Sequence, residues 1–242
     1  MTTDLSAVKA LTFDVFGTVV DWRTPVIAEV ETAARSAGIE DIDAPAVADA
    51  WRAGYPRVMN EVREGTRPWA PIDTLHRAIL DEDLAPNHGL APLTEAQRTH
   101  LNLAWHRLTP WPDAVEGLTR LKANYTIATL SNGNVALLNN MAKQAGLPWD
   151  LILSAELFGH FKPDPEVYLG AARLLGLQPH EVMMVATHAG DLRAAAANGL
   201  RTAYVPRPLE WGPDRPQPGK RDDDAFDIEA EDFVELAEAL GG

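Results

Sequence analysis

Four groups of polar residues stand at separate places along the 242-residue chain, and their residue types suit nucleophilic catalysis. They contain Asp14, the pair Ser131-Asn132, Lys162 and Asp191. A carboxylate at the tip of a strand, followed by a turn with inward N–H groups, can stay ionised and attack a carbon or phosphorus atom. A lysine near two carboxylates would hold both of them ionised. Each group alone has a common structural explanation, such as helix capping by Asp191 or turn formation by Ser-Asn, so only the combination indicates a site.

Short hydrophobic runs precede these groups and predict the strands that position them. Buried parallel strands read as continuous hydrophobic runs rather than as alternating ones. The predicted strands are Ala10–Phe13, Tyr125–Leu130, Leu151–Leu153, Val182–Ala186 and Thr202–Val205, and the predicted helices between them are Ala114–Lys122, Val135–Ala145, Glu166–Leu175 and Leu192–Asn198. Alternating strands and helices predict an α/β fold, a Rossmann-like parallel sheet with helices on both faces and polar groups at the carboxyl ends of its strands.

The segment between the first two predicted strands is different, because it shows helical patterns and no convincing strand. Those patterns are Val26–Ala37, Ala46–Glu64, Ile72–Asp81 and Glu95–Leu108. We therefore predict a helical cap domain over residues 23–108, inserted into a core of residues 1–22 and 109–242. The stretch Val205–Asp224 is rich in proline and charge, which predicts a long surface loop.

Composition narrows the possible partners and the compartment. The formal net charge is −14, from 35 acidic and 21 basic residues, which argues against binding to nucleic acid or to an anionic membrane surface. The absence of cysteine fits a reducing compartment. Residues 1–9 do not show the pattern of a signal peptide, and no hydrophobic run approaches the roughly 20 residues of a membrane span. We expect a cytoplasmic protein.

The four groups, taken in order, resemble the four motifs of the haloacid dehalogenase superfamily. The resemblance rests on Asp14-Val15-Phe16-Gly17-Thr18, Leu130-Ser131-Asn132-Gly133, Lys162-Pro163-Asp164 and the segment of Asp191, and it spans Leu11 to Val205. Two positions indicate the branch. Phosphatases of this superfamily carry a second Asp where this chain has Phe16, and a magnesium-binding Asp where it has Ala186. The chain therefore resembles the metal-independent (S)-2-haloacid dehalogenases, which implies that it needs no metal or organic cofactor.

The resemblance also implies a role for each candidate residue. Asp14 would displace a halide from C2 of a small carboxylate and form an aspartyl ester, which water would then hydrolyse. The other implied catalytic residues are Thr18, Lys162, Tyr168, His188 and Asp191, and the implied substrate-binding groups are the backbone N–H groups of Val15 and Phe16 with the side chains of Arg52, Ser131 and Asn132. Arg52 and Asn132 would stabilise the departing halide, and Ser131 would bind the substrate carboxylate. Homodimers are common among the resembling enzymes.

Three positions depart from residues often found in that branch. Ala186 and His188 stand where Ser and Asn are frequent, and Gly190 replaces an aromatic residue, which would enlarge the pocket. A neutral His188 could accept a proton from the hydrolytic water, or it could be a structural histidine.

Three alternatives to dehalogenation stay open at this stage. The first is hydrolysis of another C2 leaving group, such as a strained C–N ring next to a carboxylate, with His188 as proton donor. The second is a phosphatase, which Phe16 and Ala186 disfavour. The third is a non-catalytic ligand-binding protein, which would leave Asp14, Lys162 and Asp191 unexplained.

Overall fold

A computed structural model describes residues 5–215 and 219–241 of the chain. The chain divides into two compact units, a core made of Met1–Asp21 with Thr109–Gly242, and a second unit made of Trp22–Leu108. The division falls one residue before the predicted boundary at residue 22. Residues 1–4, part of the segment inspected for a signal peptide, lie outside the described residues.

The core contains, in the described residues, a six-stranded parallel sheet with the strand order β5-β4-β1-β6-β7-β8. Its strands are β1 (Ala10–Phe13), β4 (Thr126–Ser131), β5 (Leu151–Ser154), β6 (Val182–Ala186), β7 (Arg201–Tyr204) and β8 (Ile228–Glu229). Phe13, the last residue of β1, pairs with Thr129 of β4 and with Val185 of β6. From β1 the chain builds the sheet outward to β4 and β5 on one side and then crosses to β6, β7 and β8 on the other. The point where the strand order reverses is where open α/β sheets place their sites. The predicted α/β fold is confirmed.

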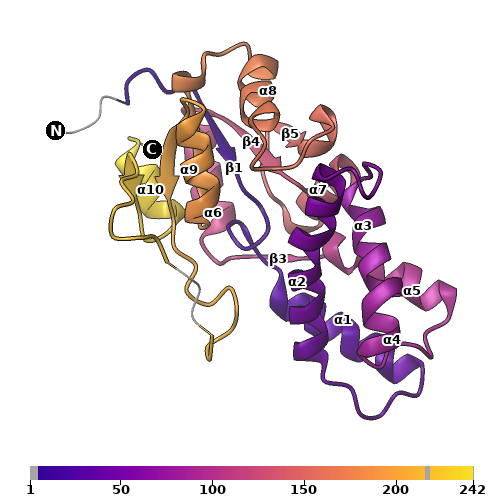
Figure 1. Ribbon diagram of the computed structural model, residues 1–242. Coiled ribbons are helices and arrows are strands. Elements are labelled where there is room, and N and C mark those ends of the chain that lie inside the picture. Colours follow the sequence, from indigo (N-terminus) through magenta and orange to yellow (C-terminus); the bar gives the residue numbers. More distant parts are fainter. Residues whose placement is uncertain (1–4, 216–218, 242) are drawn as a thin grey trace. The chain divides into compact units, whose positions relative to one another are not determined.

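Helices cover both faces of this sheet (Figure 1). They are α6 (Ala114–Lys122), α7 (Val135–Ala145), α8 (Pro165–Leu175), α9 (Ala189–Ala197) and α10 (Phe233–Ala239). α8 and α9 pack together on one face, and α10 packs on α6 on the other. Gly117 permits the close approach of α6 to α10, because a Cβ there would lie 2.4 Å from the Cβ of Phe233.

Several core elements were not predicted. β2 (Val20–Asp21) and β3 (Thr109–Pro110) form a two-residue antiparallel ribbon, which is too short to leave a pattern in the sequence. β8 and α10 follow the predicted surface loop and were also missed. The loop prediction for Val205–Asp224 is wrong in part, because Arg207 and Glu210 are buried. Residues 216–218 of this loop lie outside the described residues.

The unit Trp22–Leu108 is helical, and no strand occurs among its residues. It contains α1 (Arg23–Ser36), α2 (Ala44–Arg63), α3 (Ile72–Ile79), the π-helical turn η1 (Leu80–Leu84), α4 (Ala85–Asn87), α5 (Glu95–Asn102) and the 3₁₀ turn η2 (Leu103–His106). α2 begins after Asp43, whose side chain accepts a hydrogen bond from the N–H of Ala46, as expected for an N-cap. The indole rings of Trp22, Trp51 and Trp105 are buried together in its core.

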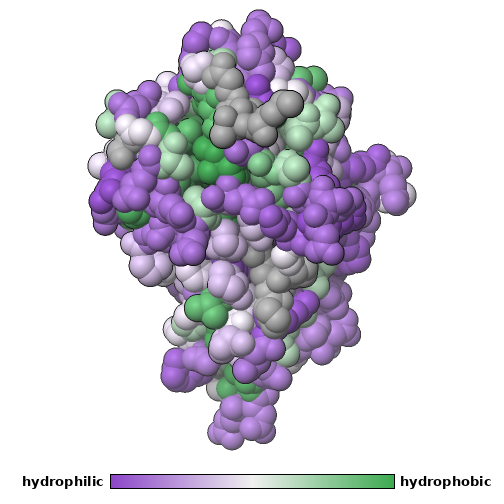
Figure 2. Space-filling view, turned by 90° about the vertical axis from the view of Figure 1, so that its left-hand side faces the viewer, coloured by the Kyte–Doolittle hydropathy of each residue, from purple (hydrophilic) through white to green (hydrophobic). Residues whose placement is uncertain are grey.

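Hydrophilic residues dominate the face of the molecule in Figure 2, with hydrophobic residues gathered mainly in the upper part of that view. Such a surface agrees with the formal net charge of −14. None of the described helices is long and apolar enough to cross a membrane.

Candidate active site

Asp14 lies directly after β1, where the chain turns sharply at the carboxyl edge of the sheet. Its N–H still donates to the carbonyl of Val185 at 3.0 Å, so the backbone is held by the sheet up to this residue. The turn then closes on itself, and Gly17 within it has a φ of +85°, a value that glycine adopts without strain. The side chain of Asp14 is only 11% exposed. The local structure therefore presents a fixed, nearly buried carboxylate.

Thr18 lies in the same turn and binds this carboxylate. Its hydroxyl donates to Oδ2 of Asp14 at 2.8 Å and accepts from the N–H of Thr187 at 3.0 Å. The hydroxyl thus links the first strand end to the end of β6, and its proton is directed at Asp14.

Lys162 connects Asp14 to the second carboxylate of the site. Its Nζ lies 3.0 Å from Oδ1 of Asp14 and 2.5 Å from Oδ2 of Asp191. The predicted residue Asn132 holds the backbone of Lys162: its Oδ1 accepts from the N–H of Lys162 at 2.7 Å, and its Nδ2 donates to the carbonyl at 3.3 Å. In this structure Asn132 therefore acts on the site through the position of Lys162.

Asp191 occupies the third position of α9, so helix capping, the structural explanation that its place in the sequence allowed, does not apply. The N-cap of α9 is His188, and it makes no side-chain capping bond. The carboxylate of Asp191 points into the site instead, where Oδ1 accepts from the hydroxyl of Tyr168 at 2.5 Å. Tyr168 is fully buried in α8, so two helices and the loop of Lys162 fix this carboxylate.

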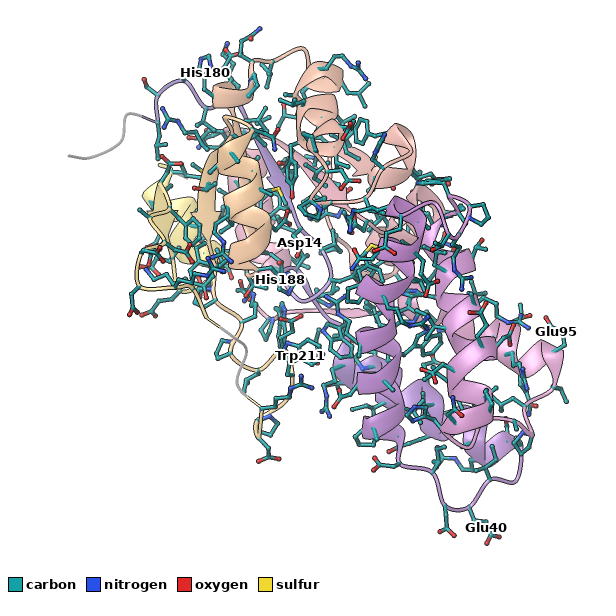
Figure 3. All side chains as sticks on the ribbon, viewed as in Figure 1. Asp14, Glu40, Glu95, His180, His188 and Trp211 are labelled. Carbon is teal, nitrogen blue, oxygen red and sulfur yellow. The ribbon has the colours of Figure 1, made fainter. Side chains whose placement is uncertain are left out.

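His188 is the second cation at Asp14. Its Nδ1 lies 2.8 Å from Oδ2 of Asp14, and its Nε2 lies 3.1 Å from both carboxylate oxygens of Glu210. Both ring nitrogens can donate to carboxylates at once only if both carry a proton. Figure 3 shows His188 close to Asp14 at this edge of the core. The neutral histidine considered from the sequence is therefore wrong for this state, and Glu210 is a site residue that sequence reasoning missed.

The pKa values of the two carboxylates of the site are shifted in opposite directions. Burial opposes ionisation of Asp14, but the charge of Lys162 and hydrogen bonds from His188 hold its pKa well below the usual range. Burial raises the pKa of Asp191, Lys162 opposes this, and the charge of Asp14 adds to the rise. Burial lowers the pKa of His188, yet hydrogen bonds to Asp14 and Glu210 raise it to about 9. Asp14 is consequently the permanent anion, facing two cations.

Ser131, Val15 and Phe16 surround the same strand ends. Ser131 is buried, and its Oγ accepts from the N–H of Gly133 at 3.1 Å, which leaves the hydroxyl proton able to donate. The ring of Phe16 lies over Gly133, since a Cβ on that glycine would come within 3.2 Å of the ring. Val15 belongs to the turn, and its carbonyl accepts from the N–H groups of Val19 and Val20 at 3.0 and 3.2 Å.

Arg52 belongs to the helical unit, on α2. Its guanidinium lies over the rings of Trp22 and Tyr55, with 5.6 and 5.0 Å from its central carbon to the ring centroids. Such cation–π contacts hold the head group of an arginine while its N–H groups stay able to donate. Its predicted role opposite Asp14 stays a prediction.

The residues at the strand ends do not fit a magnesium site. Mg²⁺ requires oxygen ligands, but Phe16 and Ala186 offer no side-chain oxygen at the two positions where phosphatases of the resembling superfamily carry Asp. The carboxylates of Asp14 and Asp191 both bind the ammonium of Lys162 instead. Across residues 5–215 and 219–241, no group of three or more His, Cys, Asp or Glu is arranged to hold a metal. The side chains at this edge of the sheet therefore suit an ammonium group rather than a divalent cation.

Comparison with known proteins adds independent findings. The family model described as haloacid dehalogenase-like hydrolase matches residues 8–199. The chain is 31% identical over 210 residues to (S)-2-haloacid dehalogenase 4A of Burkholderia cepacia, covering 84% of this chain and 85% of that protein. It is also 31% identical over 212 residues to a phosphoglycolate phosphatase of Chromobacterium violaceum, with 84% and 86% covered.

Two crystal structures are more similar. One, an L-2-haloacid dehalogenase, is 47% identical with a TM-score of 0.89, over 97% of this chain and 100% of the other. The second, a defluorinating L-2-haloacid dehalogenase, is 45% identical with a TM-score of 0.92, over 97% and 96%.

Proposed function

The chain belongs to the haloacid dehalogenase-like hydrolases, and from that premise we propose that it hydrolyses a small 2-substituted carboxylate through an aspartyl ester on Asp14. The favoured reaction is removal of the halide from an (S)-2-haloacid or a haloacetate to give a 2-hydroxy acid. The similar L-2-haloacid dehalogenases support this choice of substrate.

One observation carries the proposal: the carboxylate of Asp14 is nearly buried, yet Lys162 and His188 both bind it as cations. A carboxylate kept ionised in a dry site is a competent nucleophile toward carbon. Phosphoryl transfer of the superfamily type would also need an acid for the leaving alcohol, and Phe16 occupies that position. The site therefore suits displacement of a leaving group that departs as an anion.

In the first step an oxygen of Asp14 attacks C2 from behind, a C–O bond forms, and the halide leaves with the bonding electron pair. The configuration at C2 inverts. The substrate carboxylate is bound by the hydroxyl of Ser131 and the backbone N–H groups of Val15 and Phe16. Arg52 of the helical unit and the second Nδ2 hydrogen of Asn132, whose first donates to the carbonyl of Lys162, stabilise the halide as charge develops on it. Donors placed where charge appears are the usual source of such catalysis.

In the second step water attacks Cγ of the ester rather than C2. Asp191, whose pKa burial raises, accepts one proton from this water and then protonates the departing oxygen of the 2-hydroxy acid. The other proton of the water stays on the regenerated carboxyl of Asp14. It is lost to solvent because Asp14 is held ionised, so each turnover releases one halide and one proton.

The test measures halide release from chloroacetate, fluoroacetate and L-2-chloropropionate, without added metal. We expect release by the wild type and none by Asp14→Asn. Asp113→Asn is the matched control, because Asp113 is an acid of the same unit in a cation pair and is about as buried as Asp14, with 12% exposed against 11%. Loss of release in both variants would point to misfolding rather than to the role of Asp14.

A single turnover in H₂¹⁸O tests the ester itself. Attack of water at Cγ places the heavy oxygen in Asp14, whereas direct attack of water on C2 places it in the product. Mass spectrometry of the peptide that contains Asp14 distinguishes the two routes. Label found only in the 2-hydroxy acid would refute the ester mechanism.

The contacts of His188 support a second candidate reaction, the opening of a strained C–N ring next to a carboxylate. A ring nitrogen leaves as an amine and needs a proton, and the doubly hydrogen-bonded His188 carries one that it could donate. Incubation with azetidine-2-carboxylate, followed by detection of the open-chain hydroxy amino acid, tests this candidate. Ring opening without any halide release from the haloacids would favour it over dehalogenation.

A further inference from the structure

Glu210 is a buried carboxylate that has no role in the two proposed steps. It lies in the loop after β7, its side chain is 0% exposed, and both of its oxygens lie 3.1 Å from Nε2 of His188. The turn after β1 is shaped around it: a Cβ on Gly17 would lie only 2.2 Å from Oε1 of Glu210. A buried carboxylate needs a partner to offset its lost hydration, and His188 is such a partner here.

The hydrogen bonds on Asp14 are distributed unequally between its two oxygens. Oδ2 accepts from Thr18 and from His188, at 2.8 Å each, whereas Lys162 contacts Oδ1 at 3.0 Å. We propose that Glu210 is a positioning residue that holds His188 as a charged donor to Oδ2 of Asp14, so that Thr18 and His188 form the oxyanion site for ester hydrolysis. This inference rests on the proposed function and assigns Oδ1 as the attacking oxygen.

The chemistry of the second step explains why Thr18 and His188 both donate to Oδ2 of Asp14. In the ester, Oδ1 is bonded to C2 of the substrate and Oδ2 is the carbonyl oxygen. When the water oxygen bonds to Cγ, the π electrons move onto Oδ2, where the protons of Thr18 and His188 already point. Collapse of the intermediate restores the C–Oδ2 double bond and breaks the bond from Cγ to Oδ1, which leaves in the product. Fixed donors at a developing oxyanion are worth about 10²–10³ in rate each.

The charged groups around His188 in the core support its cationic form. Asp14 faces it from the turn after β1 and Glu210 from the loop after β7, and both are acids. Basic side chains of the core pair with carboxylates as well: Lys162 with Asp14 and Asp191, Arg207 with Asp113, and Arg193 with Asp224. The imidazole itself is 31% exposed, so solvent can still exchange its protons.

The experiment compares Glu210→Gln with the wild type in rapid-mixing assays on L-2-chloropropionate. Glutamine keeps the size of the side chain and removes its charge, so the pKa of His188 should fall below its wild-type value, most of all in the ester, where Asp14 is neutral as well. At pH 8 we expect the first burst of halide to be preserved while steady-state turnover falls about tenfold, because a neutral donor replaces a charged one. The difference should vanish near pH 5.5, and acid-quenched enzyme should carry the ester mass on Asp14.

Two further variants keep the test decisive. Asp73→Asn is the matched control, since Asp73 binds Nε2 of His106 in the helical unit with both oxygens, at 3.0 and 3.1 Å. It should change neither the burst nor its pH dependence. If Glu210→Gln does not fold, His188→Phe removes the donor directly, and ester should accumulate with a turnover about 10²–10³ lower.

The outcomes separate this inference from the proposed function. A burst and a turnover that fall together at every pH, or a quenched Glu210→Gln enzyme without ester, would overturn the role of Glu210 while wild-type dehalogenation stands. Absence of halide and of ester in the wild type would overturn the proposed function itself. NMR titration of ring-labelled histidine adds a direct readout: the pKa of His188 should fall in Glu210→Gln, and an unchanged value would contradict the inference.

Discussion

Replacing Lys162 by methionine removes the cation between the two carboxylates while filling much the same volume. In the structure, Nζ of Lys162 lies 3.0 Å from Asp14 and 2.5 Å from Asp191, and the lysine is only 7% exposed. The variant would leave two neighbouring carboxylates in a nearly dry site with one cation, His188, on Asp14. Two buried carboxylates that have lost the ammonium group between them do not both stay ionised, so one should bind a proton.

The size of the effect on Asp14 follows from the free energy lost when one partner of a buried ion pair is removed. Removing one partner costs about 3–5 kcal/mol. Asp14 keeps its hydrogen bonds from Thr18 and His188, so we take the lower end, about 3 kcal/mol. Since about 1.4 kcal/mol is a factor of ten, Asp14 should bind a proton about 10²-fold more tightly than in the wild type. The pKa of Asp14, which Lys162 and His188 hold low in the wild type, should rise accordingly.

The assay is kcat/KM for halide release between pH 5 and 9. The wild type should show no fall toward pH 5, because its nucleophile stays ionised there. Lys162→Met should lose activity toward pH 5, because its Asp14 binds a proton about 10²-fold more tightly than in the wild type, and should recover activity as the pH rises. The control Asp113→Asn breaks an equally buried pair with Arg207, so its loss of stability in urea unfolding should be similar. Its kcat/KM should show no new fall at acidic pH.

The shape of the pH profile decides the matter. If folded Lys162→Met shows the flat acid side of the wild type, then Lys162 does not control the ionisation of Asp14. The same would hold if Asp113→Asn acquired an equal acid limb, since the effect would then come from general destabilisation.

Three further predictions concern contacts in the core. The pKa of His188 is about 9 in the folded protein against 6.5 for the ordinary residue, so protonated His188 stabilises the fold by about 3 kcal/mol at most. This contribution is complete below pH 6.5 and is lost as the pH rises toward 9. In urea unfolding, the unfolding free energy of His188→Asn should not fall over this pH range in the way that of the wild type does. Tyr168→Phe removes the donor to Asp191 and should lower kcat about tenfold with KM little changed, measured in steady state. Gly17→Ala adds a side chain at positive φ against Glu210, so its unfolding free energy should fall by about 3 kcal/mol or more.

The parts of the fold that the sequence predicted are those with a local signature. β1 and β6 were predicted with the bounds they have, because strands buried on both faces leave unbroken hydrophobic runs. The contacts of Lys162 with Asp14 and Asp191 follow from the same reasoning, since parallel strands bring their carboxyl ends to one edge. The ribbon of β2 and β3 has two residues in each strand, too few for any periodicity.

Glu210 and the charge of His188 show where this reasoning stops. Glu210 lies in a proline-rich stretch whose composition predicts exposure, and its burial depends on the turn at Gly17, far away in the chain. His188 was a candidate from its place after β6, but its protonation depends on the acids that face both ring nitrogens. The pKa of a side chain depends on partners that are distant in the chain. A sequence can therefore identify the titratable residue but does not predict whether its pKa is raised or lowered.

The charges of the core also bear on how an anionic substrate would bind. Asp14, Asp191 and Glu210 contribute three negative charges, and Lys162 with His188 contribute two positive ones, so this cluster is net negative by one. Both cations are already bound to carboxylates, and the whole chain carries a net charge of −14. The attraction for a substrate carboxylate must therefore come from dipoles, such as backbone N–H groups and the Ser131 hydroxyl, and from cations outside this cluster. In the proposed mechanism Arg52, whose guanidinium lies over two aromatic rings of the helical unit, stabilises the departing halide instead.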